Sequence, residues 1–426
     1  MSSGTVFALG VGLLLAAWWA ARVGLEQLNR RHALAHADAA PEEFRHVMDA
    51  ATYARSVQYT LAQGRFEQVA ATVDAVARLG ALFSPALPWG YRAWTAGLGE
   101  SAWSVGAFLL AAGGALSLFG LPLDWYHQFR LEQRFGFNTT TPRLWWADRA
   151  RGLLLAAALG YPLVVLVLGL MAWAGAGWWG WAWGAWLGFQ VLLQGLAPVL
   201  ILPLFNRFTP LPAGPLRERL LRLAARTRFR ARAIQVMDGS KRSRHSNAFF
   251  TGFGRFRKIV LYDTLVEQLT APELEAVLAH EIGHYRMRHL PKLLLGSAAG
   301  ALAGFWLLAW LAGRAWFYEG FGFAPGYPGP ALLLFGLLAG VAGFWLAPLW
   351  RGWSRRCEYQ ADAFAAAAVG GPEPLLGALR QLAEKNLSNL TPHPCYRRFY
   401  YSHPTLRERE RALAARSASA AAGFGL

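Results

Sequence analysis

Seven apolar stretches of membrane-spanning length divide this chain of 426 residues. A transmembrane helix needs about 20 predominantly apolar residues. The candidate spans lie near residues 5–21, 76–96, 102–121, 153–174, 183–205, 293–313 and 331–350. The second is the weakest, and no Lys or Arg precedes the first, so we interpret the first as a retained anchor rather than a signal peptide. A chain with 55% hydrophobic and 16% charged residues is typical of a polytopic membrane protein.

The distribution of Lys and Arg predicts how these spans are oriented. Basic residues concentrate in four segments, 22–65, 128–151, 206–292 and 351–416. The alternate connections, near 97–101, 175–182 and 314–330, carry almost none. Cytoplasmic loops are enriched in Lys and Arg, so the pattern predicts an outside N-terminus and a cytoplasmic C-terminus. We interpret the net charge of +17 as basic loops facing the anionic leaflet of a lipid bilayer, with no nucleic-acid partner.

Two polar blocks alternate with the membrane regions and give four expected parts. Residues 1–205 form an N-terminal membrane region with five spans, 206–292 a first polar block, 293–350 a transmembrane hairpin, and 351–426 a C-terminal helical block. The first block contains a helical stretch at 215–229, followed by β-branched and aromatic runs at 233–237 and 257–265. Glycines in the intervening segment 247–256 suggest a β-hairpin. The expected fold is therefore mostly α-helical with one small β-sheet.

The stretch "AHEIGHYRMRH" is the part of the sequence that most clearly indicates a catalytic metal site. His280 and His284 frame Glu281 in the pattern H-E-x-x-H, and Thr270 and Glu273 predict a capping box that starts their helix. On a helix the two histidines lie about 40° and one turn apart, so both can reach one zinc ion. His289 falls at about 180°, and we expect it at the membrane interface rather than in the site. Glu281 is placed to act as general base on a water molecule that zinc activates.

A third zinc ligand must come from another element, since catalytic zinc takes three protein ligands and leaves one position open. Glu358 and Asp362 stand four residues apart in "CEYQADAF", which places both carboxylates on one helical face. The alternative is an ordinary solvated helix with scattered charge. Beside the H-E-x-x-H pattern, Glu358 is the best candidate ligand, and Asp362 is expected to accept a hydrogen bond from a ligating imidazole.

With these motifs in place, the chain resembles the integral-membrane zinc metallopeptidases called type I CAAX prenyl endopeptidases, which are gluzincin-like. Four blocks carry the resemblance: "FRLEQRFGFNTTTP" with "WWAD" (129–148), residues 203–265, "LAHEIGHYRMRH" (278–289) and residues 354–413. The match runs in order over nearly the whole chain. It implies seven spans and a zincin-like catalytic domain on the cytoplasmic side.

The resemblance also implies residue roles. It makes His280, His284 and Glu358 the ligands of one Zn²⁺ per chain, Glu281 the base, and Asp362 a candidate proton donor. His403 and Arg409, in "SHPTLRER", are implied to face the active site, where a donor could stabilise an oxyanion. Without the family resemblance, the alternative interpretation of His403 is a residue that opens a turn before a proline. Asn247 and Ala248 are implied to start an edge strand that holds an extended substrate peptide.

The sequence therefore predicts a zinc-dependent membrane endopeptidase whose substrate is a peptide or membrane protein, with or without a lipid group. Quality-control proteolysis of membrane proteins is the alternative within this class. A non-catalytic transporter or structural membrane protein is the alternative from another class, and spans almost free of charge argue against it. The wealth of Arg, Ala and Gly favours a bacterial plasma membrane as the location, or the ER membrane if the source is eukaryotic.

Overall fold

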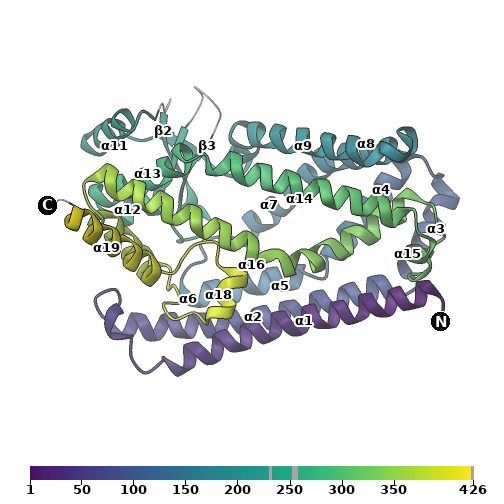
Figure 1. Cartoon of the computed structure of the whole chain (residues 1–426), viewed down its shortest axis with the longest axis horizontal. Coiled ribbons are helices and arrows are strands. Elements are labelled where there is room, and N and C mark those ends of the chain that lie inside the picture. The colour runs from purple at the N-terminus through teal and green to yellow at the C-terminus, as the bar shows by residue number, and fades with distance from the viewer. Residues whose placement is uncertain (230–232, 252–257, 424–426) are drawn as a thin grey trace.

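A computed structural model of the chain describes residues 1–229, 233–251 and 258–423, and within them it forms an elongated, mostly helical body. The N-terminus lies at one end of the long axis (Figure 1). The small sheet, α13 and the C-terminal helix α19 gather at the other end. A mostly helical membrane protein with a small sheet is what the sequence predicts, and this prediction is confirmed.

The N-terminal half consists of helices joined by short connections. The α-helices are α1 (Ser3–Ala35), α2 (Ala50–Phe83), α3 (Ala86–Leu98), α4 (Ala102–Ser117), α5 (Leu121–Tyr126), α6 (Gln133–Phe135), α7 (Pro142–Leu155), α8 (Tyr161–Trp173), α9 (Trp178–Leu196) and α10 (Leu202–Phe205). Shorter 3-10 and π-helical segments link or interrupt them: η1 (Glu42–Phe44), η2 (His127–Glu132), η3 (Ala156–Gly160), η4 (Gly175–Gly177) and η5 (Ala197–Ile201). Ser2 and Asp49 cap α1 and α2 by accepting hydrogen bonds from backbone N–H groups of the first turn.

Five helical segments of the described chain are long and apolar enough to cross a membrane, and the number reaches seven when two bent helix pairs each count as one span. The predicted second span, near 76–96, is one of these pairs, because α2 and α3 meet there at 55°. Ser84 is extended, with ψ of 159°, as expected for a residue that precedes a proline. Ser84 and Pro85 therefore end α2 and redirect the chain.

Helices α1 and α2 carry a charged cluster at the edges of the predicted spans 5–21 and 76–96. Asp74 lies 3.3 Å from Arg22 and 2.8 Å from Arg78, and Arg78 also donates to the Leu337 carbonyl at 2.6 Å. These charges satisfy one another at the inner face of the bundle, where Asp74 and Arg78 line a largely apolar cavity of about 610 Å³. Arg22 and Asp74 lie just outside the predicted spans, whereas Arg78 lies inside the second one.

One four-stranded sheet stands beside the helices in the order β1-β2-β4-β3. Its strands are β1 (Phe208–Pro210), β2 (Ala233–Met237), β3 (Ala248–Thr251) and β4 (Lys258–Tyr262). β2 and β4 run parallel, whereas β3 pairs antiparallel with β4 only and forms an edge. The turn of the expected hairpin, residues 252–257, lies outside the described residues. The predicted run 257–265 is a strand only to Tyr262, because α12 (Asp263–Gln268) begins there.

The C-terminal half contains the remaining helices, some beside the sheet and others, such as α15, at the opposite end of the molecule (Figure 1). They are α11 (Pro215–Arg226), the 3-10 segment η6 (Gly239–Lys241), α13 (Ala271–Arg286), α14 (His289–Ala312), α15 (Ala315–Glu319), α16 (Pro328–Val369), α17 (Glu373–Lys385), α18 (Pro394–Tyr400) and α19 (Leu406–Gly423). The predicted capping box of Thr270 and Glu273 is present at the start of α13. Helix α14 and the first part of α16 are candidate membrane spans, and they separate α13 in sequence from the C-terminal part of α16. This C-terminal part, which carries Glu358 and Asp362, is called the inner end of α16.

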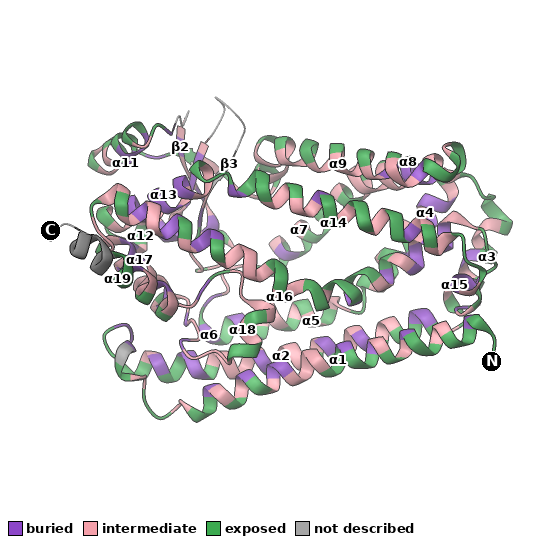
Figure 2. Cartoon of the chain, in the orientation of Figure 1, coloured by how far each residue is buried: buried purple, intermediate pink, exposed green. Residues whose placement is uncertain are grey.

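Close contact between α13 and the inner end of α16 positions the candidate site. A Cβ atom on Gly283 would lie 3.0 Å from the Ala361 Cα and 3.1 Å from its carbonyl oxygen, so only glycine permits this approach. Buried residues gather at this end in α12, α13 and the sheet (Figure 2). Apolar residues of these elements form one core, which includes Leu261, Leu265 and Ala365. The two helices that carry the candidate ligands are therefore fixed by a solid core and not by the membrane region alone.

Candidate metal centre

His280 and His284 of α13 face Glu358 of α16. Their Nε2 atoms lie 3.1 Å apart, and Glu358 Oε2 is 3.3 Å from His280 Nε2 while Glu358 Oε1 is 3.4 Å from His284 Nε2. Among the described residues, these three form the one group of His, Cys, Asp or Glu side chains that could hold a metal ion. Their ligand atoms all lie within 4.8 Å of one another.

The spacing of these atoms fits zinc. Tetrahedral zinc with bonds of about 2.0–2.1 Å holds its ligand atoms about 3.3 Å apart. The two Nε2 atoms are separated by about this distance, and each lies about as far from one of the two Glu358 oxygens. Glu358 Oε2 is buried and has no hydrogen-bond partner. An acceptor left unpaired in the interior is costly. A cation at this point would remove that cost, so the donor set is suited to a metal ion.

Asp362 and Arg409 stand behind His280. Asp362 Oδ1 lies 2.8 Å from His280 Nδ1, and Arg409 reaches both Asp362 oxygens, at 2.8 and 2.5 Å. All three side chains are buried. The carboxylate keeps the proton of His280 on Nδ1 and thereby leaves Nε2 free for a metal. Arg409 is thus engaged with Asp362 in this structure rather than directed at open space.

The prediction that His289 faces away from the site is wrong. It is buried, and its Nδ1 lies 3.0 Å from His284 Nδ1 while its Nε2 lies 2.9 Å from Gln360 Oε1. The geometric argument assumed one regular helix, but α13 ends at Arg286 and Arg288 adopts a left-handed conformation, with φ of 55°. This break turns His289 back toward the site. Pro291 was the available signal, since proline is favoured in the first turn of a new helix.

His289 and Gln360 were missed by sequence reasoning, and together they define the proton positions around His284. His289 Nε2 faces the Gln360 oxygen and must donate to it, so a neutral His289 accepts at Nδ1. The proton shared by the two Nδ1 atoms then belongs to His284. His284 Nε2 is left unprotonated and points at His280 and Glu358, as a metal ligand requires.

Glu281 and His403 flank the three candidate ligands. Burial raises the pKa of the Glu281 carboxyl to about 7, near the range where a carboxyl group can both accept and return a proton. His403 lies in the loop between α18 and α19, where its Nε2 is 3.4 Å from Glu358 Oε1. Its side chain is 63% exposed, so it can meet a bound molecule.

Asn247 and Ala248 lie at the start of the edge strand β3. The Asn247 side chain accepts a hydrogen bond from the Ala248 N–H at 2.8 Å, and the Asn247 carbonyl accepts from the Tyr262 N–H at 3.1 Å. A pocket of about 600 Å³ opens beside them and is lined also by His403 and Arg409. The structure thus brings the residues expected to hold a peptide next to those expected to cut it. Asn386, in the same pocket wall, was not anticipated.

Comparison with known proteins relates this geometry to a family. Residues 29–207 match the CAAX prenyl protease N-terminal region with five membrane helices, and residues 210–417 match peptidase family M48. The chain is 38% identical to CAAX prenyl protease 1 of Saccharomyces cerevisiae over 70% of this chain and 69% of that protein. It is 32% identical to the CAAX prenyl protease 1 homolog of Oryza sativa subsp. japonica over 90% and 92%. The crystal structure of S. mikatae Ste24p superposes with a TM-score of 0.87 at 32% identity, covering 95% of this chain and 99% of that one.

Proposed function

The chain belongs to peptidase family M48 and is a membrane metalloendopeptidase, and we propose that its metal is one zinc ion per chain, held by His280, His284 and Glu358. The observation that carries this proposal is the convergence of ligand atoms from His280, His284 and Glu358 within 4.8 Å of one another, with Glu358 Oε2 buried and unpaired. Zinc at this position would polarise the scissile carbonyl and make a water molecule acidic enough to react near neutral pH.

The remaining residues act on protons and on the substrate. Glu281 accepts the proton of the attacking water and returns it to the leaving amine. His403 donates a hydrogen bond to the oxygen that gains negative charge at the scissile carbon. Asp362 keeps His280 in the tautomer that binds metal, as His289 does for His284. Arg409 neutralises Asp362 and holds it in place.

The substrate enters as an extra strand at the free edge of β3. Its backbone takes over the Ala248 N–H, which the Asn247 side chain occupies in the present structure. We propose that the peptide carries an S-prenylated cysteine near its C-terminus, a substrate class supported by the names of the similar yeast and rice proteins. The relevant membrane is proposed to be a bacterial plasma membrane, or the ER membrane if the source is eukaryotic.

Removal and return of metal tests this function. The purified protein is stripped with a chelator and offered two quenched fluorescent peptides that differ only in an S-farnesyl group on the cysteine. Cleavage should vanish on stripping, return with about one equivalent of Zn²⁺ and be faster for the farnesylated peptide. Full activity in the stripped protein would refute the zinc centre. Equal rates for the two peptides would refute the prenylated substrate while leaving the peptidase intact.

The catalytic face is proposed to be cytoplasmic because the basic residues lie on the same side as α13 and the inner end of α16. Ala324, between α15 and α16, and Ala414, in α19, are exposed positions on opposite sides of this arrangement. With Cys357 and Cys395 replaced by Ser, Ala324→Cys should react with an impermeant thiol reagent outside intact cells. Ala414→Cys should react only after permeabilisation, and its labelling from outside would reverse the assignment.

A further inference from the structure

Residues 239–245 contact the loop between α6 and α7, which is far from them in sequence. Asn138 and Ser243 form an isolated β-bridge, and the Arg244 N–H donates to the Phe137 carbonyl at 3.0 Å. Thr140 Oγ1 donates to the Arg242 carbonyl at 3.0 Å. These contacts account for "GFNTTTP" and "GSKRSRHSN", two motifs that the metal centre does not use. They join the membrane helices to the polypeptide that leads into β3.

Arg242 strengthens the joint on the side away from the metal centre. Its guanidinium donates to both oxygens of Asp148 in α7, at 2.8 and 3.1 Å, and to Asn206 Oδ1 at 3.1 Å. Paired hydrogen bonds between a guanidinium and a carboxylate fix orientation as well as distance. Arg242, which directly precedes the lead-in segment (residues 243–247), is therefore anchored to α7 and to the residue that follows α10.

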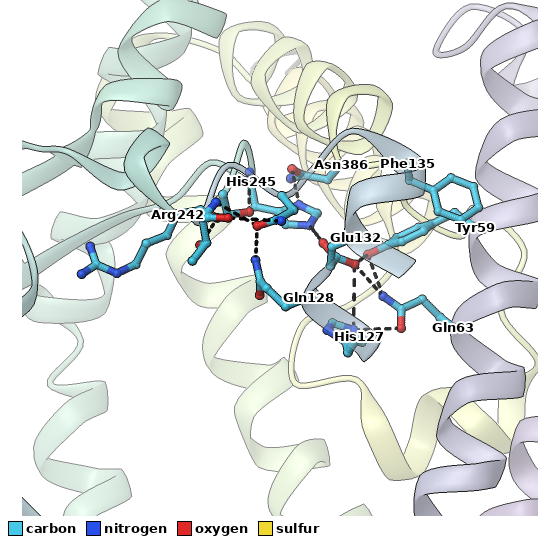
Figure 3. A network of polar contacts seen from close by, with 12 residues as sticks. Tyr59, Gln63, His127, Gln128, Glu132, Phe135, Arg242, His245 and Asn386 are labelled. Atoms are coloured by element: carbon cyan, nitrogen blue, oxygen red, sulfur yellow. Dashed lines mark hydrogen bonds and ion pairs between the residues drawn. The ribbon is translucent and has the colours of Figure 1, made fainter. Parts of the chain in front are cut away.

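His245 is the centre of the lead-in segment (Figure 3). Its Nε2 lies 3.2 Å from Glu132 Oε2 in η2, and its Nδ1 lies 3.0 Å from Asn386 Oδ1 at the end of α17. Both partner atoms are acceptors, so the doubly protonated, cationic ring satisfies both contacts at once. Phe137 stacks on the ring at 4.2 Å, an arrangement that suits a cation.

Glu132 is held in turn by the N-terminal helices. Its Oε1 accepts hydrogen bonds from the Tyr59 hydroxyl at 2.7 Å and from Gln63 Nε2 at 3.0 Å, both in α2. The carboxylate is buried, and each of its oxygens has a donor. His127 Nε2 approaches Oε1 at 3.9 Å from the same turn of helix. Glu132, His127 and Tyr59 are the titratable groups that these elements present toward His245.

The two residues next along the chain, Ser246 and Asn247, line the pocket beside the metal centre, as does Asn386. His245 is therefore linked to the pocket lining in two ways, through its chain neighbours Ser246 and Asn247 and through the contact of its Nδ1 with Asn386. We propose that the Glu132–His245 contact is a positioning device for the substrate, which fixes β3 and the Asn386 wall at the separation that an incoming peptide strand needs. The inference rests on the proposed function, because it assigns a part in binding the peptide that the metal centre cuts.

The contact has a pH dependence of known sign. Burial disfavours the charged imidazole, but hydrogen bonds to Glu132 and Asn386 and the charge of Glu132 outweigh it and raise the pKa of His245 above its ordinary value. A raised pKa in the folded protein means that the contact is complete below the ordinary value and is lost as pH rises through the folded value. Peptide binding should weaken over the same range.

Kinetics with the farnesylated peptide test the proposal. His245→Gln and Glu132→Gln should each raise KM about tenfold, as expected for loss of one charge-assisted hydrogen bond. Both should leave kcat within about threefold and zinc content unchanged. His127→Gln is the matched control, because it alters a neighbour of the same carboxylate that does not touch the lead-in segment. An equal fall in kcat and kcat/KM in the two variants, or an equal effect of the control, would overturn the inference.

The pH profile separates positioning from a general loss of structure. In the wild-type protein kcat/KM should decline as pH rises through the raised pKa of His245, and His245→Gln should lack that decline. Identical profiles contradict the proposal.

Hydrogen exchange at the Tyr262 amide, which donates to the Asn247 carbonyl, provides a readout on the unmodified protein without substrate. Its protection, corrected for intrinsic exchange, should fall over the same pH range, and constant protection contradicts the proposal. A wild-type protein that cleaves neither peptide refutes the proposed function. Hydrogen exchange at the Tyr262 amide would still test the positioning role of the Glu132–His245 contact in that case.

Discussion

Two buried carboxylates, Glu358 and Glu132, have similar neighbours and opposite degrees of hydrogen-bond satisfaction. Each faces a histidine nitrogen at 3.2–3.4 Å. Both Glu132 oxygens accept hydrogen bonds, whereas Glu358 Oε2 accepts none. Buried polar groups in folded proteins are nearly always paired, so the exception indicates a place reserved for a ligand. Hydrogen bonding therefore distinguishes the candidate binding site at Glu358 from the structural contact at Glu132.

The histidines show the same difference. Those beside Glu358 present bare nitrogen atoms to one point, because Asp362 and His289 take up their protons on the opposite side of each ring. The histidine beside Glu132 uses both ring nitrogens as donors to fixed acceptors. The cluster around Glu358 has a buried acceptor without a partner, whereas both oxygens of Glu132 have donors. Mutations of matched size should therefore have opposite consequences at the two places.

The largest effect is expected at Glu281, the proposed general base beside the first cluster. Glu281→Gln removes the proton acceptor but keeps the shape of the side chain, so turnover should fall about 1,000-fold. Zinc content and thermal stability should stay at wild-type levels, since Glu281 is not one of the three proposed ligands. Measured kcat on the farnesylated peptide and metal analysis of the same sample check this. Turnover near the wild-type rate would remove Glu281 from the role of base.

A matched pair of isosteric changes tests the comparison directly. Glu358→Gln should weaken zinc binding more than about 100-fold. Mutation of a residue that only hydrogen-bonds to a metal ligand costs up to about 100-fold in affinity, and loss of a ligand itself should cost more. In metal-free protein the same change should raise the thermal unfolding temperature, since the new amide can donate to the bare histidine nitrogens. Glu132→Gln should lower the unfolding temperature under the same conditions. The same direction of shift in both variants would end the distinction between the clusters.

The parts of the structure that could be predicted from the sequence depend on local spacing. Apolar stretches located the spans, and four-residue spacing placed His280 beside His284 and Glu358 beside Asp362. Each of these pairs lies on one helix, where geometry follows from 3.6 residues per turn. The runs at 233–237 and 257–265 were recognisable as strands because β-branched and aromatic residues concentrate there, although the second strand ends at Tyr262.

The parts that could not be predicted depend on backbone breaks and distant contacts. His289 joins the site only because Arg288 turns the chain between two helices. The contact between Glu132 and His245 spans 113 positions, and nothing in either segment indicates the other. Gly283 permits the close approach of α13 and α16, but glycine in a helix is not informative until its neighbour is known. Tertiary packing decides all three.

His403 should show an intermediate effect, because it is proposed to contact the substrate and not the metal. His403→Ala removes a donor from the developing oxyanion and should slow turnover about 100-fold. Zinc affinity should change little, and so should the stability of the metal-free protein, given that the side chain is largely exposed. Single-turnover rates beside zinc titration separate these effects. A loss of zinc affinity as large as that of Glu358→Gln would make His403 a ligand instead of an oxyanion donor.

The smallest effect is expected at His289, whose contribution passes through His284. His289→Ala removes the acceptor that keeps the His284 proton on Nδ1, so zinc affinity should fall about tenfold. His289→Gln can still present an oxygen to that proton and should recover part of the affinity. Competition with a chromogenic zinc chelator measures both variants without reference to activity. Asp362→Asn is the matched change behind His280, and it should cost more because the lost acceptor is charged. Wild-type affinity in His289→Ala would show that the ring of His284 is held by packing alone, and that the buried position of His289 reflects the helix break rather than the metal.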